Sequence, residues 1–204
     1  MLTLLGKPTS INVRKVLWLC EELALPLLHD PLDAPGDGAR LRALNPNGLV
    51  PVLIDGDAVL WESNTICRYL AAREQRHDLL PADPLARARV EQWMDWQATE
   101  LNTTWRPAFM ALVRRSPAYQ DAAATEASIA GWNRLMTLLD AQLAHTAAYV
   151  AGSDFTLADI VLGLSANRWL MTPMARPDLP AVAAWVARLE TRAGYRAHGR
   201  NGVP

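Results

Sequence analysis

The sequence predicts an α/β domain over residues 1–77 followed by an all-α domain over residues 84–204. Short apolar runs alternate with helical periodicity in the first part, as in a mixed sheet with helices packed on it. Only helical periodicity follows in the second part. Between them, the segment HDLLPADP has two prolines and two aspartates, which is typical of a linker.

The first domain begins with an alternation of strand and helix. Leu2–Leu5 is a short apolar run that predicts a buried strand. Val13–Leu23 carries apolar residues at helical spacing, and Pro26 ends that helix. Leu27–Asp30 predicts a second strand, which the following proline would place at a sheet edge. Ala39–Leu44 predicts one or two helical turns.

A hairpin and a helix complete the first domain. Val50–Ile54 and Ala58–Trp61 predict antiparallel strands, because an Asp-Gly turn joins two apolar runs. Ser63–Ala72 places its apolar residues on one face of a helix. The expected order is therefore β-α-β-α-β-β-α.

Four helical patterns follow in the second domain, over residues 90–105, 135–143, 157–169 and 182–189. The third pattern opens with a capping-box sequence. Thr156 and Asp159 should cap each other's backbone, and Phe155 should pack on Ile160. The tail, residues 194–204, has three glycines and is expected to be irregular and partly mobile.

The composition is ordinary for a globular protein and argues against several partners. The net charge is −1 and the basic residues form no stripe, so we expect neither nucleic acid nor a membrane as a partner. No apolar stretch reaches the roughly 18 residues that span a bilayer, and no leader pattern opens the chain, so we expect the cytoplasm. Cys20 and Cys67 are expected to be buried free thiols, and no metal-ligand spacing occurs.

The first candidate ligand segment is NPNGLVPVL, Asn45–Leu53. Asn-Pro-Asn-Gly predicts a turn. Pro51 cannot donate to a strand ladder, so the backbone groups of its neighbour Val50 should stay free. A cis Val50–Pro51 bond would turn them towards a ligand, whereas a trans proline opening an edge strand is the other interpretation.

Two further segments carry polar groups at helix starts. Ser63 follows a predicted strand and is either a simple N-cap or, with Glu62, a site for an α-amino acid head group. In that second interpretation Glu62 binds the ammonium, and the Ser63 hydroxyl and helix amides bind the carboxylate. Thr9, Ser10 and Asn12, in the turn GKPTSIN, likewise either cap the first helix or hold a ligand.

Together these segments resemble the cytosolic glutathione transferase family, and within it the bacterial theta-related and nu-like enzymes. The shared features are the Ser-bearing turn, the Val-Pro turn, the Glu-Ser pair and the helical second domain. The resemblance implies a thioredoxin-like first domain, a cis Pro51, a homodimer, and glutathione as co-substrate without a cofactor. It places glutathione against Thr9, Leu49, Val50, Pro51, Glu62 and Ser63.

The implied function is glutathione transferase activity, in which the glutathione thiolate attacks an apolar electrophile. A free thiol is only a few per cent ionised at neutral pH, and lowering its pKa by about two units requires roughly 2.7 kcal/mol. One hydroxyl donor and the positive end of a helix can supply this. We expect Ser10 to be the donor, with Asn12 second and Thr9 third.

The electrophile pocket is expected between the domains, with Trp105, Phe109, Met110 and Trp169 as candidates, each of which could equally be a core residue. Arg106 and Arg168 could attract an anionic substrate or form a solvated face. Many relatives have a basic residue where Leu49 stands, so Arg40 or Arg42 is the candidate for the glycyl carboxylate of glutathione.

Two alternative functions would use the same features. One is glutathione-dependent reduction of peroxides or disulfides. The other is non-catalytic, namely a glutathione-binding or ligand-carrier protein.

Overall fold

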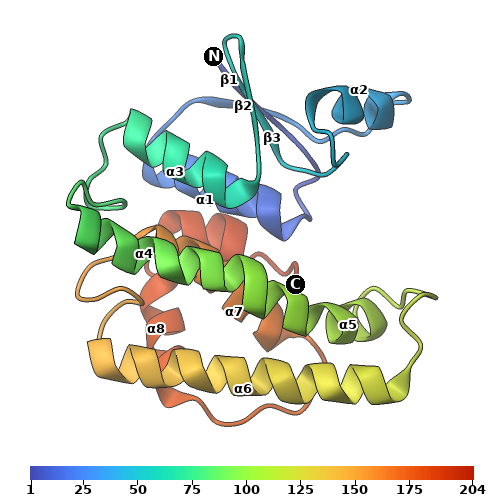
Figure 1. The fold of residues 1–204 in the computed structure, drawn as a ribbon, viewed down its shortest axis with the longest axis vertical. Coiled ribbons are helices and arrows are strands. Elements are labelled where there is room, and N and C mark those ends of the chain that lie inside the picture. The colour runs from blue at the N-terminus through green and yellow to red at the C-terminus, as the bar shows by residue number, and fades with distance from the viewer.

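A four-stranded mixed sheet forms the centre of the first domain in the computed structural model, which describes residues 1–204 (Figure 1). The strands are β1 (Leu2–Leu5), β2 (Leu27–Asp30), β3 (Val52–Asp55) and β4 (Ala58–Trp61), in the order β2-β1-β3-β4. β1 pairs parallel with β2 and antiparallel with β3, and β3 pairs antiparallel with β4. The third strand is therefore interior and starts at Val52, so Pro51 precedes it and does not open an edge strand.

Three helices accompany the sheet, in the predicted order. They are α1 (Ile11–Glu22), α2 (Asp37–Leu44) and α3 (Ser63–Arg73). Figure 1 shows α1 and α3 between the sheet and the helical domain, while α2 stands apart and has no buried residue. Because α1 is covered on both sides, even Arg14 and Lys15 are buried in it.

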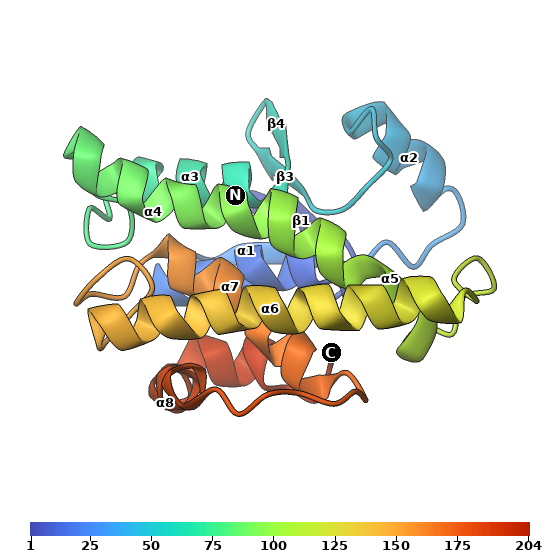
Figure 2. The same cartoon turned by 60° about the horizontal axis from the view of Figure 1, so that its bottom comes forward.

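The second domain is entirely helical. Its helices are α4 (Pro84–Trp96), α5 (Asn102–Leu112), α6 (Ala122–Thr146), α7 (Leu157–Met171) and α8 (Pro180–Leu189). A π-helical turn, Gln97–Leu101, interrupts the single helix expected over residues 90–105. Figure 2 shows α5 continuing the course of α4, with α6 alongside. No helix combines the length and the apolar character needed to cross a bilayer.

The expectation of an irregular tail holds for residues 200–204 but not for the segment before them. Residues Tyr195–Gly199 form a second π-helical turn, and Tyr195 is fully buried with its ring 5.0 Å from that of Trp18. Beyond it, Arg14 donates hydrogen bonds to the carbonyls of Val203 and Pro204, at 2.7 and 3.2 Å. A buried guanidinium in α1 thus holds residues 203 and 204 against the interior.

The capping box at the start of α7 is present as predicted, and its carboxylate does more than cap. Asp159 is fully buried and accepts from the backbone N–H groups of Thr156 and Val150, at 2.9 and 3.0 Å. It also accepts from the Trp185 indole in α8 at 2.9 Å. Phe155 packs against the rings of Trp18 and Tyr149 and belongs to the same buried core as Ile160. The Asp159 carboxylate therefore connects α7, α8 and the loop that precedes α7.

Replacing this carboxylate should destabilise the protein. We expect Asp159→Ala to lower the free energy of unfolding by about 3 kcal/mol, because it leaves buried N–H donors without an acceptor. Urea unfolding followed by circular dichroism measures this. The matched control is Asp154→Ala at an exposed position five residues earlier, which should change stability by less than about 0.5 kcal/mol. Equal effects of the two substitutions would contradict the assigned role.

Candidate functional site

The turn that leads into α1 leaves a serine hydroxyl free at the helix N-terminus. Ser10 has extended backbone angles and occupies the N-cap position, but its side chain makes no capping hydrogen bond. Gly6 opens this turn with φ +141°, and a Cβ there would lie 2.6 Å from Val13 and 2.8 Å from Val50. Glycine is therefore required for the close approach of the turn to Val50.

Val50 contributes free backbone groups beside this turn. Its peptide bond to Pro51 is cis, and neither its N–H nor its C=O takes part in a backbone hydrogen bond. The buried Asn45 shapes the turn, since its amide donates to the Leu49 carbonyl at 2.7 Å and its oxygen accepts from the Asn47 N–H at 3.0 Å. Polar backbone atoms of Val50 thus remain available for an extended ligand.

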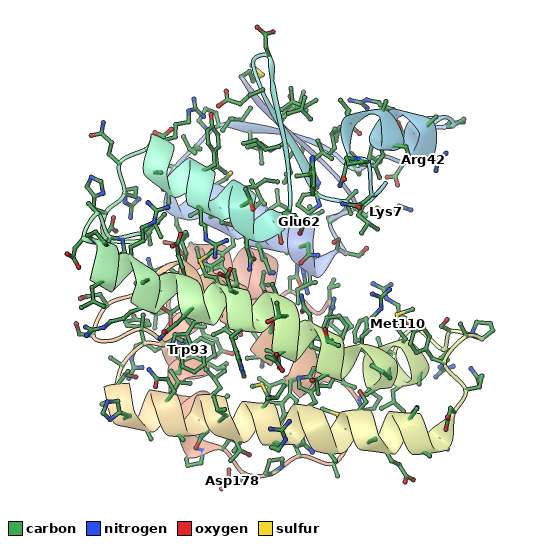
Figure 3. All side chains as sticks on the ribbon, in the orientation of Figure 1. Lys7, Arg42, Glu62, Trp93, Met110 and Asp178 are labelled. Atoms are coloured by element: carbon green, nitrogen blue, oxygen red, sulfur yellow. The ribbon has the colours of Figure 1, made fainter.

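Glu62 and Ser63 form the junction between β4 and α3. Glu62 is exposed with φ +70° and ψ +112°, a conformation that costs a non-glycine residue about 1–3 kcal/mol. Ser63 follows as the first residue of α3 and is 5% exposed. Glu62 is therefore the N-cap residue of α3, and its side chain makes no capping hydrogen bond to the orphan amides of that helix (Figure 3).

A buried lysine lies behind Ser63. The Lys15 ammonium is 3.5 Å from the Ser63 hydroxyl, 3.0 Å from the Asn64 side-chain oxygen and 2.8 Å from that of Gln97. All three partners are neutral, and burial lowers the pKa of Lys15 to about 8. Gln97 in turn donates to Asn102, which also accepts from the Trp105 indole. A continuous polar chain thus links the start of α3 to α5.

A cavity of about 490 Å³ opens between the α1 turn and α5. Figure 3 shows Lys7 on the first domain and Met110 on α5 at opposite sides of this region. The lining residues are Lys7, Thr9, Ser10, Ile11, Asn12, Val50, Asn102, Trp105, Arg106, Phe109, Met110, Arg114 and Arg168. The structure therefore brings together Thr9, Ser10, Asn12 and Val50 with Trp105 and Phe109.

Other predicted residues lie elsewhere. Trp169 faces a separate cavity with Arg176 and Leu179, and its indole donates to Asn133 at 2.9 Å, so it does not line the cavity beside Ser10. Arg168 is 4% exposed, so its interpretation as part of a solvated face is wrong. Leu49 is exposed and Pro51 is buried at the turn behind Val50.

The two candidate arginines for the glycyl carboxylate differ in their surroundings. Arg40 is paired with Asp30 at 2.6 Å. Arg42, labelled on α2 in Figure 3, has its stem against Gly48, two residues before Val50. Arg42 forms no ion pair and is therefore the better placed of the two.

Comparison with known proteins identifies the family. The N-terminal domain model of glutathione S-transferases matches residues 4–77, and the C-terminal domain model matches residues 97–193. The chain belongs to the glutathione S-transferase family. The resemblance inferred from the Ser, Val-Pro and Glu-Ser segments is therefore confirmed, as is the fold of a mixed-sheet domain followed by a helical one.

Similar members of this family come from bacteria and plants. Glutathione S-transferase GstB of Escherichia coli is 38% identical over 201 residues, covering 96% of both chains. Glutathione S-transferase 3 of Zea mays is 35% identical over 96% of this chain and 88% of its own length. A theta class glutathione S-transferase of Xanthomonas axonopodis pv. citri, solved with glutathione bound, is 38% identical with a TM-score of 0.87, over 97% and 96% of the two chains.

Sequence reasoning missed several residues of this transferase site. Asn102 and Arg114 line the cavity, and Lys15 lies behind Ser63. Arg114 carried no local signal, because only the fold brings the end of α5 to the first domain. Arg168 is not among the missed residues, because the sequence already made it a candidate for attracting an anionic substrate.

The two cysteines are not reactive candidates. Cys20 and Cys67 are free and buried, and burial raises the pKa of each thiol to about 12. Neither lines the cavity beside Ser10, so the chain itself offers no thiolate there.

The buried ammonium can be observed directly. The chain has two lysines, Lys7 and Lys15, so carbon NMR of the lysine side chains should give two resonances. We expect that of Lys15 to titrate with a midpoint near pH 8, because its burial disfavours the charged form. The Lys7→Met variant assigns the signals. A Lys15 resonance that stays unchanged up to about pH 10 would show that its hydrogen bonds to neutral side chains compensate fully for the burial of the ammonium.

Proposed function

We propose that this chain is a glutathione transferase that holds glutathione as a thiolate at Ser10 and directs it at an electrophile in the adjoining cavity. The observation that carries the proposal is the free Ser10 hydroxyl at the α1 N-terminus, lining the same cavity as Trp105 and Phe109. Support from similarity comes from the bacterial relatives named as glutathione S-transferases, one of them solved with glutathione bound.

The γ-glutamyl end of glutathione is assigned to the junction of β4 and α3. Glu62 would bind the ammonium, and the Ser63 hydroxyl with the first amides of α3 would bind the carboxylate. The Lys15 ammonium, 3.5 Å from the Ser63 hydroxyl, adds positive charge behind that carboxylate. Thr9, Leu49, Val50 and Pro51 would contact the rest of the glutathione molecule, and the free Val50 backbone would pair with the cysteinyl backbone. Arg42 is the proposed partner of the glycyl carboxylate.

The thiolate is stabilised without a general base. Ser10 donates its hydroxyl hydrogen to the sulfur, and the unpaired amides of the first turn of α1, with Asn12, present positive charge to the same point. A donor to an anion contributes about 1.5–3 kcal/mol, which matches the depression of the thiol pKa that the reaction needs. The proton leaves to solvent, and the sulfur attacks the electrophile held against Trp105 and Phe109. Glutathione is consumed as co-substrate, and this scheme uses no other cofactor.

A cytoplasmic homodimer with a role in detoxification is the proposed context. The support for a dimer is the apolar surface of α4, where Leu85 is 62% exposed. Trp93 and Trp96 of the same helix are half-buried, with ring centroids 5.3 Å apart.

Removing the Ser10 hydroxyl should weaken the thiolate. We expect Ser10→Ala to raise the thiol pKa of bound glutathione by about one to two units, and to lower kcat/KM near pH 6.5 by about 10- to 100-fold. Titration of the ultraviolet thiolate absorbance measures the pKa. Asn12→Ala and Thr9→Ala serve as comparisons with smaller expected shifts. A pKa unchanged by Ser10→Ala but raised by Asn12→Ala would transfer the donor role to Asn12.

Altering the head-group site should abolish binding without affecting the rest of the fold. We expect Glu62→Gln and Ser63→Ala to weaken glutathione binding at least tenfold, so that immobilised glutathione no longer retains either variant. Thr65→Ala, at an exposed position of the same helix, is the control and should be retained like the parent chain. Retention of the Glu62→Gln and Ser63→Ala variants would refute the assigned site.

A further inference from the structure

The cavity beside Ser10 is lined by basic side chains and by no acidic one. Lys7, Arg106, Arg114 and Arg168 all reach it, and no Asp or Glu does. The remaining walls include the aromatic rings of Trp105 and Phe109. The sequence alone led us to expect an apolar electrophile there, with Arg106 and Arg168 either attracting an anion or facing solvent.

The arginines of this cavity are not paired with carboxylates. Some arginines elsewhere in the chain, namely Arg40, Arg76 and Arg192 among others, each bind an aspartate or a glutamate. None of the ion pairs in the chain involves Arg106, Arg114 or Arg168. Their charge is therefore not neutralised within the protein.

Arg168 is the buried member of this group. Its guanidinium lies 4.0 Å from the centroid of the Phe109 ring and 4.5 Å from that of Trp105, and these aromatic faces hold it at the cavity wall. Its only hydrogen bond is a long one, 3.5 Å, to the Pro204 carbonyl, and its Nε has no partner at all. Donor capacity is thus left unused on a side chain that solvent barely reaches.

A second buried cation lies behind the first. Arg14 is fully buried, and its partners are the Asn201 side chain and the carbonyls of Val203 and Pro204. The pKa of Arg168 is lowered to about 9 by burial and by the charges of Arg14 and Arg114. The positive charges of Arg168, Arg14 and Arg114 repel one another, and a buried charge without a counter-charge is costly. A bound anion would relieve both effects.

We propose that the electrophile is a small organic anion, with an apolar reactive body against Trp105 and Phe109 and a carboxylate or equivalent group bound by Arg168, Arg106 and Arg114. This inference rests on the proposed transferase function and names the substrate class for it. With an aryl chloride, the thiolate forms the C–S bond as the C–Cl bond breaks and chloride leaves with the electron pair. The cations also reduce the repulsion between the substrate's carboxylate and the thiolate at Ser10.

Equilibrium binding tests the anion site independently of catalysis. The probes are 3,5-dinitrobenzoate and 3,5-dinitrobenzamide, which share the ring and differ in charge. We expect the parent chain to bind the benzoate at least tenfold more tightly than the benzamide, as measured by calorimetry. The same preference is expected when S-methylglutathione is present. Arg168→Met and the exposed pair Arg106→Gln with Arg114→Gln should each reduce this preference, and added salt should weaken it. Arg134→Gln, exposed on α6 and unpaired, is the control and should keep it.

Several results would overturn the inference. One is a parent chain without preference for the benzoate. Another is a preference for the benzoate that survives both sets of substitutions. The double substitution of the exposed Arg106 and Arg114 keeps the test valid if Arg168→Met does not fold. A third is a preference that disappears with S-methylglutathione, since glutathione's own carboxylates would then occupy the cations. Conjugation of the 4-chloro derivatives of both probes is measured separately. If neither derivative is conjugated, the proposed function is contradicted. The anion site is decided only by the ratio of the affinities for the benzoate and the benzamide.

Discussion

The burial of two basic side chains in α1 is the constraint on which the rest of the structure depends. Arg14 and Lys15 are neighbours in a helix enclosed by the sheet domain and the helical domain, and burying a charge without partners costs several kcal/mol. Lys15 obtains its partners from α3 and from the π-helical turn. Arg14 obtains its partners from residues 201–204. Both domains and residues 201–204 are thereby held to one helix.

This arrangement fixes the place of the site. The N-terminus of α1 carries Ser10 and Asn12, so any element bound to the middle of α1 is also positioned relative to them. Gln97 shows how, because its oxygen accepts from Lys15 while its amide donates to Asn102 on the cavity wall. A π-helical turn changes the angular position of the residues that follow it, and such turns occur often at functional sites. Here the turn allows Gln97 to point inward while Asn102 and Trp105 reach the cavity.

The sequence predicted the features that depend on local chemistry. The order of strands and helices followed from apolar periodicity, and the turns at Ser10, Val50 and Ser63 followed from residue types with defined backbone preferences. It named both Arg168 and Trp169 as candidates for the cavity, and only Arg168 lines it. These neighbours lie about 100° apart on α7, a helix buried on nearly all sides, so no polar face showed which one reached the cavity. The tail was misjudged for a similar reason, since its glycines are visible locally but its bonds to Arg14 are not.

The distribution of charge separates the two parts of the site. The groups at the N-terminus of α1 that are proposed to stabilise the thiolate are a hydroxyl and helix amides, which carry no net charge, and Lys7 is the one charged side chain of this domain that lines the cavity. Across the cavity the potential comes from full charges, and Arg168 keeps its charge in a buried position with aromatic faces in place of an acid. An acidic side chain beside Arg168 would offset the cost of burying its charge, as Glu22 does for the partly buried Arg192. The two buried arginines, Arg14 and Arg168, both lack an acidic side-chain partner, and Arg168 is the one that lines the cavity. Its counter-charge therefore has to come from the ligand.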